Sequence, residues 1–130
     1  VELFGIFGNN DGEKRGLENA FEVIGGKLLG DVGKIELDGL KFCIYHGQDL
    51  KKKEKIMKSG KFDVFVFGHT HTRYPKGVDT EIINDTIVLN PGTAHSVAKT
   101  FASDTQYFGE SSIMIFDTTT KQFKFFDLRQ

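Results

Sequence analysis

The spacing of apolar and polar positions predicts strands and helices that alternate along the first half of the chain. Residues 3–7 and 63–67 are short, largely apolar runs that each meet a glycine, which is typical of buried strands. Apolar residues recur at i, i+3, i+4 and i+7 over residues 17–24, so a helix is expected there. A polar stretch over residues 49–59, closed by Gly60, predicts a surface helix.

The second half of the chain is dominated by predicted strand pairs. These pairs are residues 34–37 with 40–45, 81–83 with 86–89, and 112–116 with 122–126. The first pair flanks Asp38-Gly39, a dipeptide typical of two-residue hairpins, and the second flanks Asn84-Asp85. Residues 94–109 show no period and are expected to form a long loop. Helices early and hairpins late indicate a layered α/β architecture with mixed sheets.

Composition narrows the class of protein. A chain of 130 residues suits one domain, with 38% hydrophobic and 27% charged residues as in ordinary globular proteins. The net charge of −1 gives no strong nucleic-acid or anionic-membrane signal, although Lys51–Lys53 is a local basic patch. No apolar run reaches transmembrane length. Cys43 is the only cysteine, which excludes an internal disulfide and suits a cytoplasmic protein.

Polar residues follow three of the predicted strands at the point where each strand ends. They are Gly8-Asn9-Asn10-Asp11, His46-Gly47-Gln48 and Gly68-His69-Thr70-His71. In open α/β sheets, ligands bind outside the carboxyl ends of strands. These three segments, which hold three of the four histidines, are therefore expected to converge on one site.

Each element also has a structural interpretation when it is taken alone. In an extended chain, His69 and His71 would lie about 6.6 Å apart, a span that suits one ligand to each of two metal ions. The pair could equally hold a single metal or form a hydrogen-bonded turn. His46 suits a structural role in a buried strand. Asn9 and Asp11 suit a turn or a helix cap.

Together, these elements resemble the calcineurin-like metallophosphoesterase family. The family's Gly-Asn-His-Asp/Glu, His-Gly and Gly-His-x-His elements correspond to Gly8–Asp11, His46-Gly47 and Gly68–His71, in the same order. The turn Asn90-Pro91-Gly92-Thr93 is similar to the family's Asn-Pro-Gly-Ser turn. The resemblance covers nearly the whole chain and is strongest to small phosphodiesterases of bacteria and archaea. It implies an α/β/β/α sandwich.

The resemblance also implies a chemistry. In that family, two divalent metals share a water or hydroxide that attacks phosphorus. By position, Asn9, His46 and His69 resemble ligands of one metal, and His71 resembles a ligand of the other. The implied substrate is a small phosphodiester. The implied metal is Mn²⁺, with Ni²⁺, Fe²⁺, Co²⁺ or Zn²⁺ as alternatives.

Two departures from the family pattern affect the expected activity. Asn10 stands where the family has a histidine that assists the leaving group, and an amide cannot transfer a proton at neutral pH. The family's Asp-x-His and Gly-Asp elements should precede Gly8, and Gly30-Asp31 suits a turn instead. We therefore expect residues 1–130 to be the C-terminal portion of a metallophosphoesterase domain, truncated before Val1 and weakly active or inactive when isolated.

Two other functions are compatible with the sequence. A non-catalytic, retromer-type scaffold of the same fold would bind partner proteins and would not need four metal-ligating side chains. A mononuclear metal site would use His46, His69 and His71, but would leave Asn9 and the Asn-Pro-Gly turn unexplained. A homo-oligomer is a further possibility.

Overall fold

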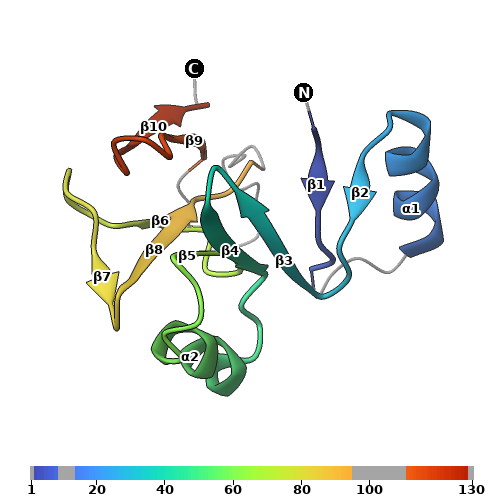
Figure 1. Cartoon of the computed structure of the whole chain (residues 1–130). Helices are drawn as coiled ribbons and strands as arrows, with labels where there is room; N and C mark the ends of the chain where they lie inside the picture. The colour runs from blue at the N-terminus through green and yellow to red at the C-terminus, as the bar shows by residue number, and fades with distance from the viewer. Residues whose placement is uncertain (1, 9–13, 95–110, 129–130) are drawn as a thin grey trace, which may run out of the picture.

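The computed structural model describes residues 2–8, 14–94 and 111–128, which form helices and strands in three sheets (Figure 1). The elements in chain order are β1 (Phe4–Gly5), α1 (Lys14–Val23), β2 (Lys27–Leu28), β3 (Val32–Leu37), β4 (Leu40–Tyr45), α2 (Leu50–Lys58), β5 (Val64–Phe67), β6 (Arg73–Tyr74), β7 (Ile82–Ile83), β8 (Thr86–Pro91), β9 (Ser112–Phe116) and β10 (Phe123–Asp127). Neither helix of the described residues is long and apolar enough to span a membrane.

A six-stranded mixed sheet organises the fold. Its strand order is β3-β4-β5-β8-β6, and β7 also pairs with β8. Strands β4, β5 and β8 are parallel neighbours, whereas β3, β6 and β7 are antiparallel to their partners. Helix α2 connects β4 to β5 as a parallel crossover requires. The predicted mixed α/β fold is confirmed.

Both faces of the sheet are covered, which explains the uninterrupted apolar runs in its central strands. On one face, Cys43, Phe65 and Val88 are fully buried beneath Ile56 and Met57 of α2. On the other face, a second set packs against the β9–β10 hairpin; its buried members are Phe42, Val64, Ile87 and Leu89. Figure 1 shows α2 and the hairpin on opposite sides of the sheet.

Two tight turns set the register of the hairpins. Asp38 and Gly39 have φ values of 52° and 78°, and Asn84 and Asp85 have values of 47° and 65°. Positive φ at both central residues is the geometry of a type I′ turn, whose twist matches that of the flanking strands. The β3–β4 hairpin pairs Leu37 with Leu40 across its turn, as the sequence predicts.

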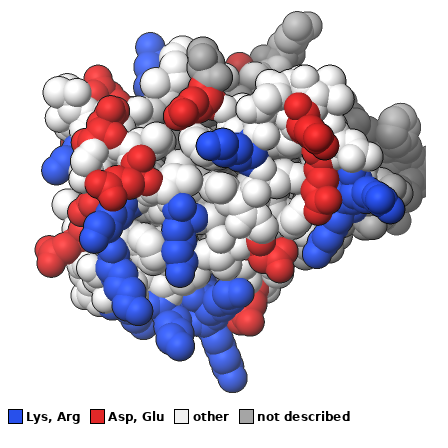
Figure 2. All heavy atoms as spheres, turned by 45° about the vertical axis from the view of Figure 1, so that its right-hand side comes forward, with Lys and Arg blue, Asp and Glu red and all other residues white. Residues whose placement is uncertain are grey.

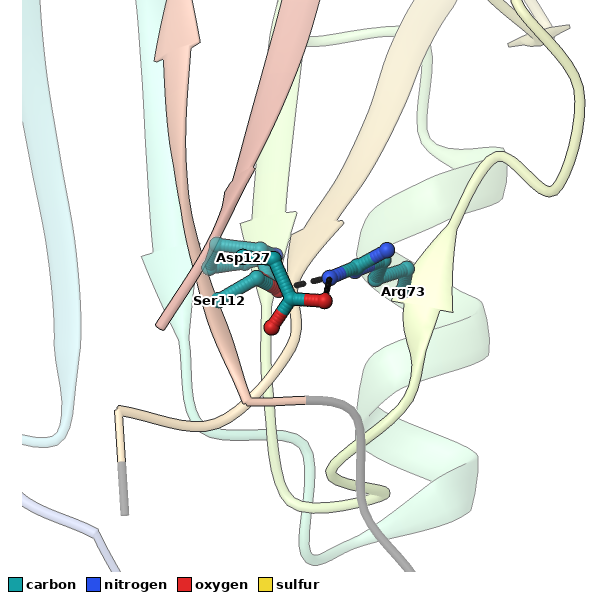
Figure 3. A network of polar contacts seen from close by, with 4 residues as sticks. Arg73, Ser112 and Asp127 are labelled. Carbon is teal, nitrogen blue, oxygen red and sulfur yellow. Dashed lines mark hydrogen bonds and ion pairs between the residues drawn. The ribbon is translucent and has the colours of Figure 1, made fainter. Parts of the chain in front are cut away.

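A polar contact ties the β9–β10 hairpin to the edge of the main sheet (Figure 3). Arg73 of β6 donates from Nε to Ser112 Oγ at 3.0 Å, and its guanidinium lies 3.8 Å from a carboxylate oxygen of Asp127. Ser112 Oγ in turn donates to the carbonyl oxygen of Pro91 at 2.6 Å. These contacts join strands β6, β8, β9 and β10.

The first strand forms a small unit with β2 and α1 beside β3 (Figure 1). Strands β1 and β2 are parallel, and Phe7 N donates to the carbonyl oxygen of Gly30 at 3.0 Å. The backbone of Gly5 lies against the Phe21 ring, since a Cβ there would lie 2.5 Å from that ring. Ile6 likewise lies against Gly33 of β3. This packing brings the end of β1 toward the main sheet.

The predicted and observed elements differ in a few places. Strands β2 and β6 have two residues each, which is too short to give an apolar period. They are strands only because their backbones pair with β1 and β8. The strand expected over residues 3–7 is assigned only at Phe4–Gly5. Most of the loop expected over 94–109 lies outside the described residues.

The buried thiol of Cys43 should make stability depend on pH. Burial raises its pKa from 9.0 to about 11, and the charge of Lys34 opposes this shift. Between these values the unfolded chain releases the proton and the folded chain keeps it, so stability falls as pH rises. Between pH 8 and 11, the free energy of unfolding of the wild type should fall by about 2 kcal/mol more than that of Cys43→Ala, as measured by urea unfolding. A constant difference between the two proteins over this range would contradict the assignment.

Candidate metal centre

The three parallel strands at the centre of the sheet end at one edge and place polar residues there. His46 follows β4, Gly68 and His69 follow β5, and Asn90 lies near the end of β8. Gly68 N donates to the carbonyl oxygen of His46 at 2.9 Å, which extends the contact between the first two strands past their last paired residues. Side chains 23 positions apart in sequence therefore meet because their strands are parallel neighbours.

His46 and His69 are in direct contact at this edge. His46 Nε2 lies 3.3 Å from His69 Nδ1, and the ring centroids are 5.1 Å apart at an interplanar angle of 75°. Two neutral imidazoles can share one N–H at this distance. Two nitrogens bound to one cation at about 2.0–2.1 Å in a tetrahedral arrangement would also lie about 3.3–3.4 Å apart. The observed pair therefore fits a shared metal ion.

The segment that follows β1 reaches His46. A Cβ on Gly8 would lie 3.2 Å from His46 Nδ1, so the Gly8 backbone lies against the imidazole and a larger residue would press on it. The predicted ligand Asn9 is the next residue in the chain. Asn9, Asp11 and Asn10, which stands at the family's catalytic histidine position, lie outside the described residues. Gly8, the first residue of the Gly8–Asp11 segment, therefore lies against His46.

The His69–His71 segment has a backbone that differs from the expected one. His69 and His71 have φ values of 70° and 60°, so the extended geometry assumed for the pair is wrong. Left-handed conformations cost non-glycine residues about 1–2 kcal/mol, although histidine is enriched among the residues that adopt them. Within the described residues, no three His, Cys, Asp or Glu side chains form a group able to hold a metal ion. The roles of Asn9 and His71 as metal ligands stay predictions.

Asn90 is hydrogen-bonded to the His69–His71 segment through Thr70, a role that the sequence pattern did not reveal. Its side chain is fully buried, its Nδ2 donates to Thr70 Oγ1 at 3.0 Å, and its Oδ1 accepts from Gly92 N at 3.0 Å. Thr70 Oγ1 is also 3.1 Å from Thr72 Oγ1. Asn90 thus links the end of β8 to the residue between the two histidines. The only indication in the sequence was the Asn-Pro-Gly-Thr turn.

Two further sequence features can be placed, Lys53 and the Gly30-Asp31 dipeptide. Lys53 of α2 lies beside Gly47, with its Nζ 3.9 Å from the centroid of the Phe67 ring. Burial lowers the pKa of this ammonium group, and Glu54 opposes the shift. Gly30-Asp31 lies between β2 and β3, where Gly30 has a φ of 86° and the chain bends at Asp31.

Replacing Asn90 should destabilise the protein through Thr70. Asn90→Ala removes two hydrogen bonds of a fully buried side chain and should cost about 2–3 kcal/mol in urea unfolding. Thr70→Val keeps the side-chain size but removes the hydroxyl, and should cost about 1 kcal/mol. The double variant should cost less than the sum of the two, because both changes remove one shared bond. Fully additive costs would show that this bond does not couple the segments.

Three comparisons relate this geometry to known proteins. The calcineurin-like phosphoesterase superfamily domain matches residues 1–121. Phosphodiesterase MJ0936 of Methanocaldococcus jannaschii is 38% identical over 93 residues, which are 71% of this chain and 53% of that protein. The chain therefore spans about half the length of this relative.

Two solved structures are similar to this fold. One is a novel archaeal phosphodiesterase, with a TM-score of 0.72, 29% identity, and coverage of 96% of this chain and 68% of that one. The other is Vps29 of Entamoeba histolytica complexed with zinc, with a TM-score of 0.54, 16% identity, and coverage of 98% and 83%. The second likeness is one of fold alone. Because the domain matches nearly the whole chain and the archaeal relative is 38% identical, the chain belongs to the calcineurin-like phosphoesterase superfamily.

Proposed function

We propose that this protein hydrolyses small phosphodiesters with the help of two divalent metal ions. The observation that carries the proposal is the His46–His69 contact of 3.3 Å at the carboxyl edge of parallel strands. The similarity to an archaeal protein and to an archaeal structure that are both described as phosphodiesterases supports the reaction class. Membership of the phosphoesterase superfamily supports hydrolysis in general.

The proposed ligands divide between two metal ions. His46 and His69 hold one ion together with Asn9, and His71 contributes to the other. When bound, such paired cations neutralise the phosphodiester's charge and activate water for in-line attack. Imidazole nitrogen combined with amide oxygen suits Mn²⁺, with Ni²⁺, Fe²⁺, Co²⁺ and Zn²⁺ as alternatives.

The chain's own residues limit the substrates. Asn10 cannot donate a proton to a leaving group at neutral pH, because an amide does not titrate there. Substrates with leaving groups that need little protonation, such as aryl phosphodiesters, are therefore favoured. Cytoplasmic location and homo-oligomer formation belong to the same proposal.

A scaffold function has less support than hydrolysis. The likeness to Vps29 rests on 16% identity and concerns the fold. His46 and His69 keep nitrogen atoms within ligand distance of a common point, which a surface that only binds protein does not require. Hydrolysis explains this pair and the scaffold does not.

Metal binding tests the ligand assignment directly. His46→Ala and His69→Ala should each weaken Mn²⁺ or Zn²⁺ binding at least about tenfold in calorimetric titrations, because each removes one of few ligands. His71→Ala should instead lower the number of ions bound, since it removes the proposed ligand of the second ion. His95→Ala, at the one histidine outside the three predicted segments, is the matched control. Unchanged binding by both His46→Ala and His69→Ala would refute the proposed site.

Hydrolysis tests the completeness of the site. The 130 residues contain no Asp-x-His element, so one metal ion would lack carboxylate ligands. We expect slow hydrolysis of bis(p-nitrophenyl) phosphate by this chain with Mn²⁺. Fusion before Val1 of a segment with Asp-x-His and Gly-Asp elements should raise kcat/KM about 100-fold or more. Equal rates with and without that segment would contradict the assignment of the second metal.

A further inference from the structure

A second concave site lies between α2 and β3, on the face of the sheet that α2 covers. The groove has a volume of about 460 Å³, within the range of small-ligand pockets. Lys52 and Lys55 line it from α2, Lys34 lines it from β3, and Lys61 lines it from the segment after α2. The four ammonium side chains thus come from both walls of one groove.

The charge of this groove is unbalanced. Its lining contains no Asp or Glu, although the whole chain has a net charge of −1. None of these four lysines forms an ion pair with a carboxylate in the described part of the chain. Figure 2 shows Lys and Arg side chains gathered at the lower end of the molecule, where α2 lies in Figure 1. The groove therefore offers a positive rim with no internal counter-charge.

The floor of the groove is apolar. It consists of Val32, Ile56 and Phe62, all half-buried, above the fully buried Cys43. Ser59 is the only neutral hydroxyl in the lining, and its Oγ already donates to the carbonyl oxygen of Ile56 at 2.8 Å. An apolar floor under a cationic rim suits a ligand that has both an apolar ring system and several negative charges.

The groove is separate from the histidine site. No histidine lines it, and Cys43 of β4 lies three residues before His46, a distance of about 10 Å in an extended chain. A ligand in the groove would lie along the flank of α2. Binding there therefore does not require the metal ligands.

We propose that this groove binds a nucleoside di- or triphosphate, with the base on the apolar floor and the phosphates against the lysines. Lysine ammonium groups bind phosphate as point charges, and four of them match the charge of a di- or triphosphate better than that of a single phosphate. The lining has few groups that could read the edge of a base, so adenine and guanine nucleotides bind with similar affinity.

Calorimetric titration of the 130-residue chain with ADP, in low salt and EDTA, tests this site without the metal centre. ADP binds at one site per chain, GDP binds within about threefold of ADP, and adenosine or inorganic diphosphate binds more weakly than either. Lys34→Gln, Lys55→Gln and Lys61→Gln each weaken ADP binding about two- to fivefold, as expected for exposed charge contacts. Lys51→Gln, on the same helix but outside the groove, is the matched control and leaves the affinity unchanged.

Three results would overturn the proposal. Inorganic diphosphate that binds as tightly as ADP would show that the apolar floor plays no part. If Lys51→Gln lowered the affinity for ADP as much as Lys55→Gln, the general positive charge of the helix, and not the groove, would attract ADP. Binding of a single-stranded oligonucleotide without binding of ADP would assign the surface to nucleic acid. Because EDTA is present throughout, none of these results depends on the proposed hydrolysis.

Discussion

Parallel pairing of β4, β5 and β8 is the constraint on which the rest of the structure depends. These strands carry the fully buried residues Cys43, Val64, Phe65 and Val88, and burial of large apolar side chains contributes about 1.5–3 kcal/mol each. A sheet that is apolar on both faces must be covered on both. Helix α2 covers one face because the β4–β5 crossover needs a connection there, and the β9–β10 hairpin covers the other.

The same pairing creates the candidate metal centre. Parallel strands end at one edge, so the residues that follow them meet although they are distant in the sequence. His46 and His69 meet in this way, and Asn90 on the next strand holds the residue between the two histidines. The left-handed backbone at His69 and His71 flanks Thr70, which accepts the hydrogen bond from Asn90.

Helix α2 combines two roles that its composition alone would not suggest. Ile56 and Met57 pack on the sheet, while lysines occupy the flanks of the helix. Lys53, on the same helix, places its ammonium group over the Phe67 ring, with Nζ 3.9 Å from the ring centroid. One short helix therefore closes a face of the core and makes the adjoining groove basic, although the chain as a whole is nearly neutral.

Sequence by itself determined the elements whose signal is local. An apolar run indicated β5, helical spacing indicated α1, and Asp38-Gly39 and Asn84-Asp85 indicated their hairpins, because turns and periodicity depend on neighbouring residues. The meeting of His46 with His69 was also predictable once both strands were assumed parallel. Only the tertiary structure revealed the short strands β2 and β6 and the left-handed backbone at His69 and His71. The same is true of the hydrogen bond from Asn90 to Thr70 and of the basic groove. Each of these depends on contacts between segments distant in the chain, and such contacts leave no periodic pattern in the sequence.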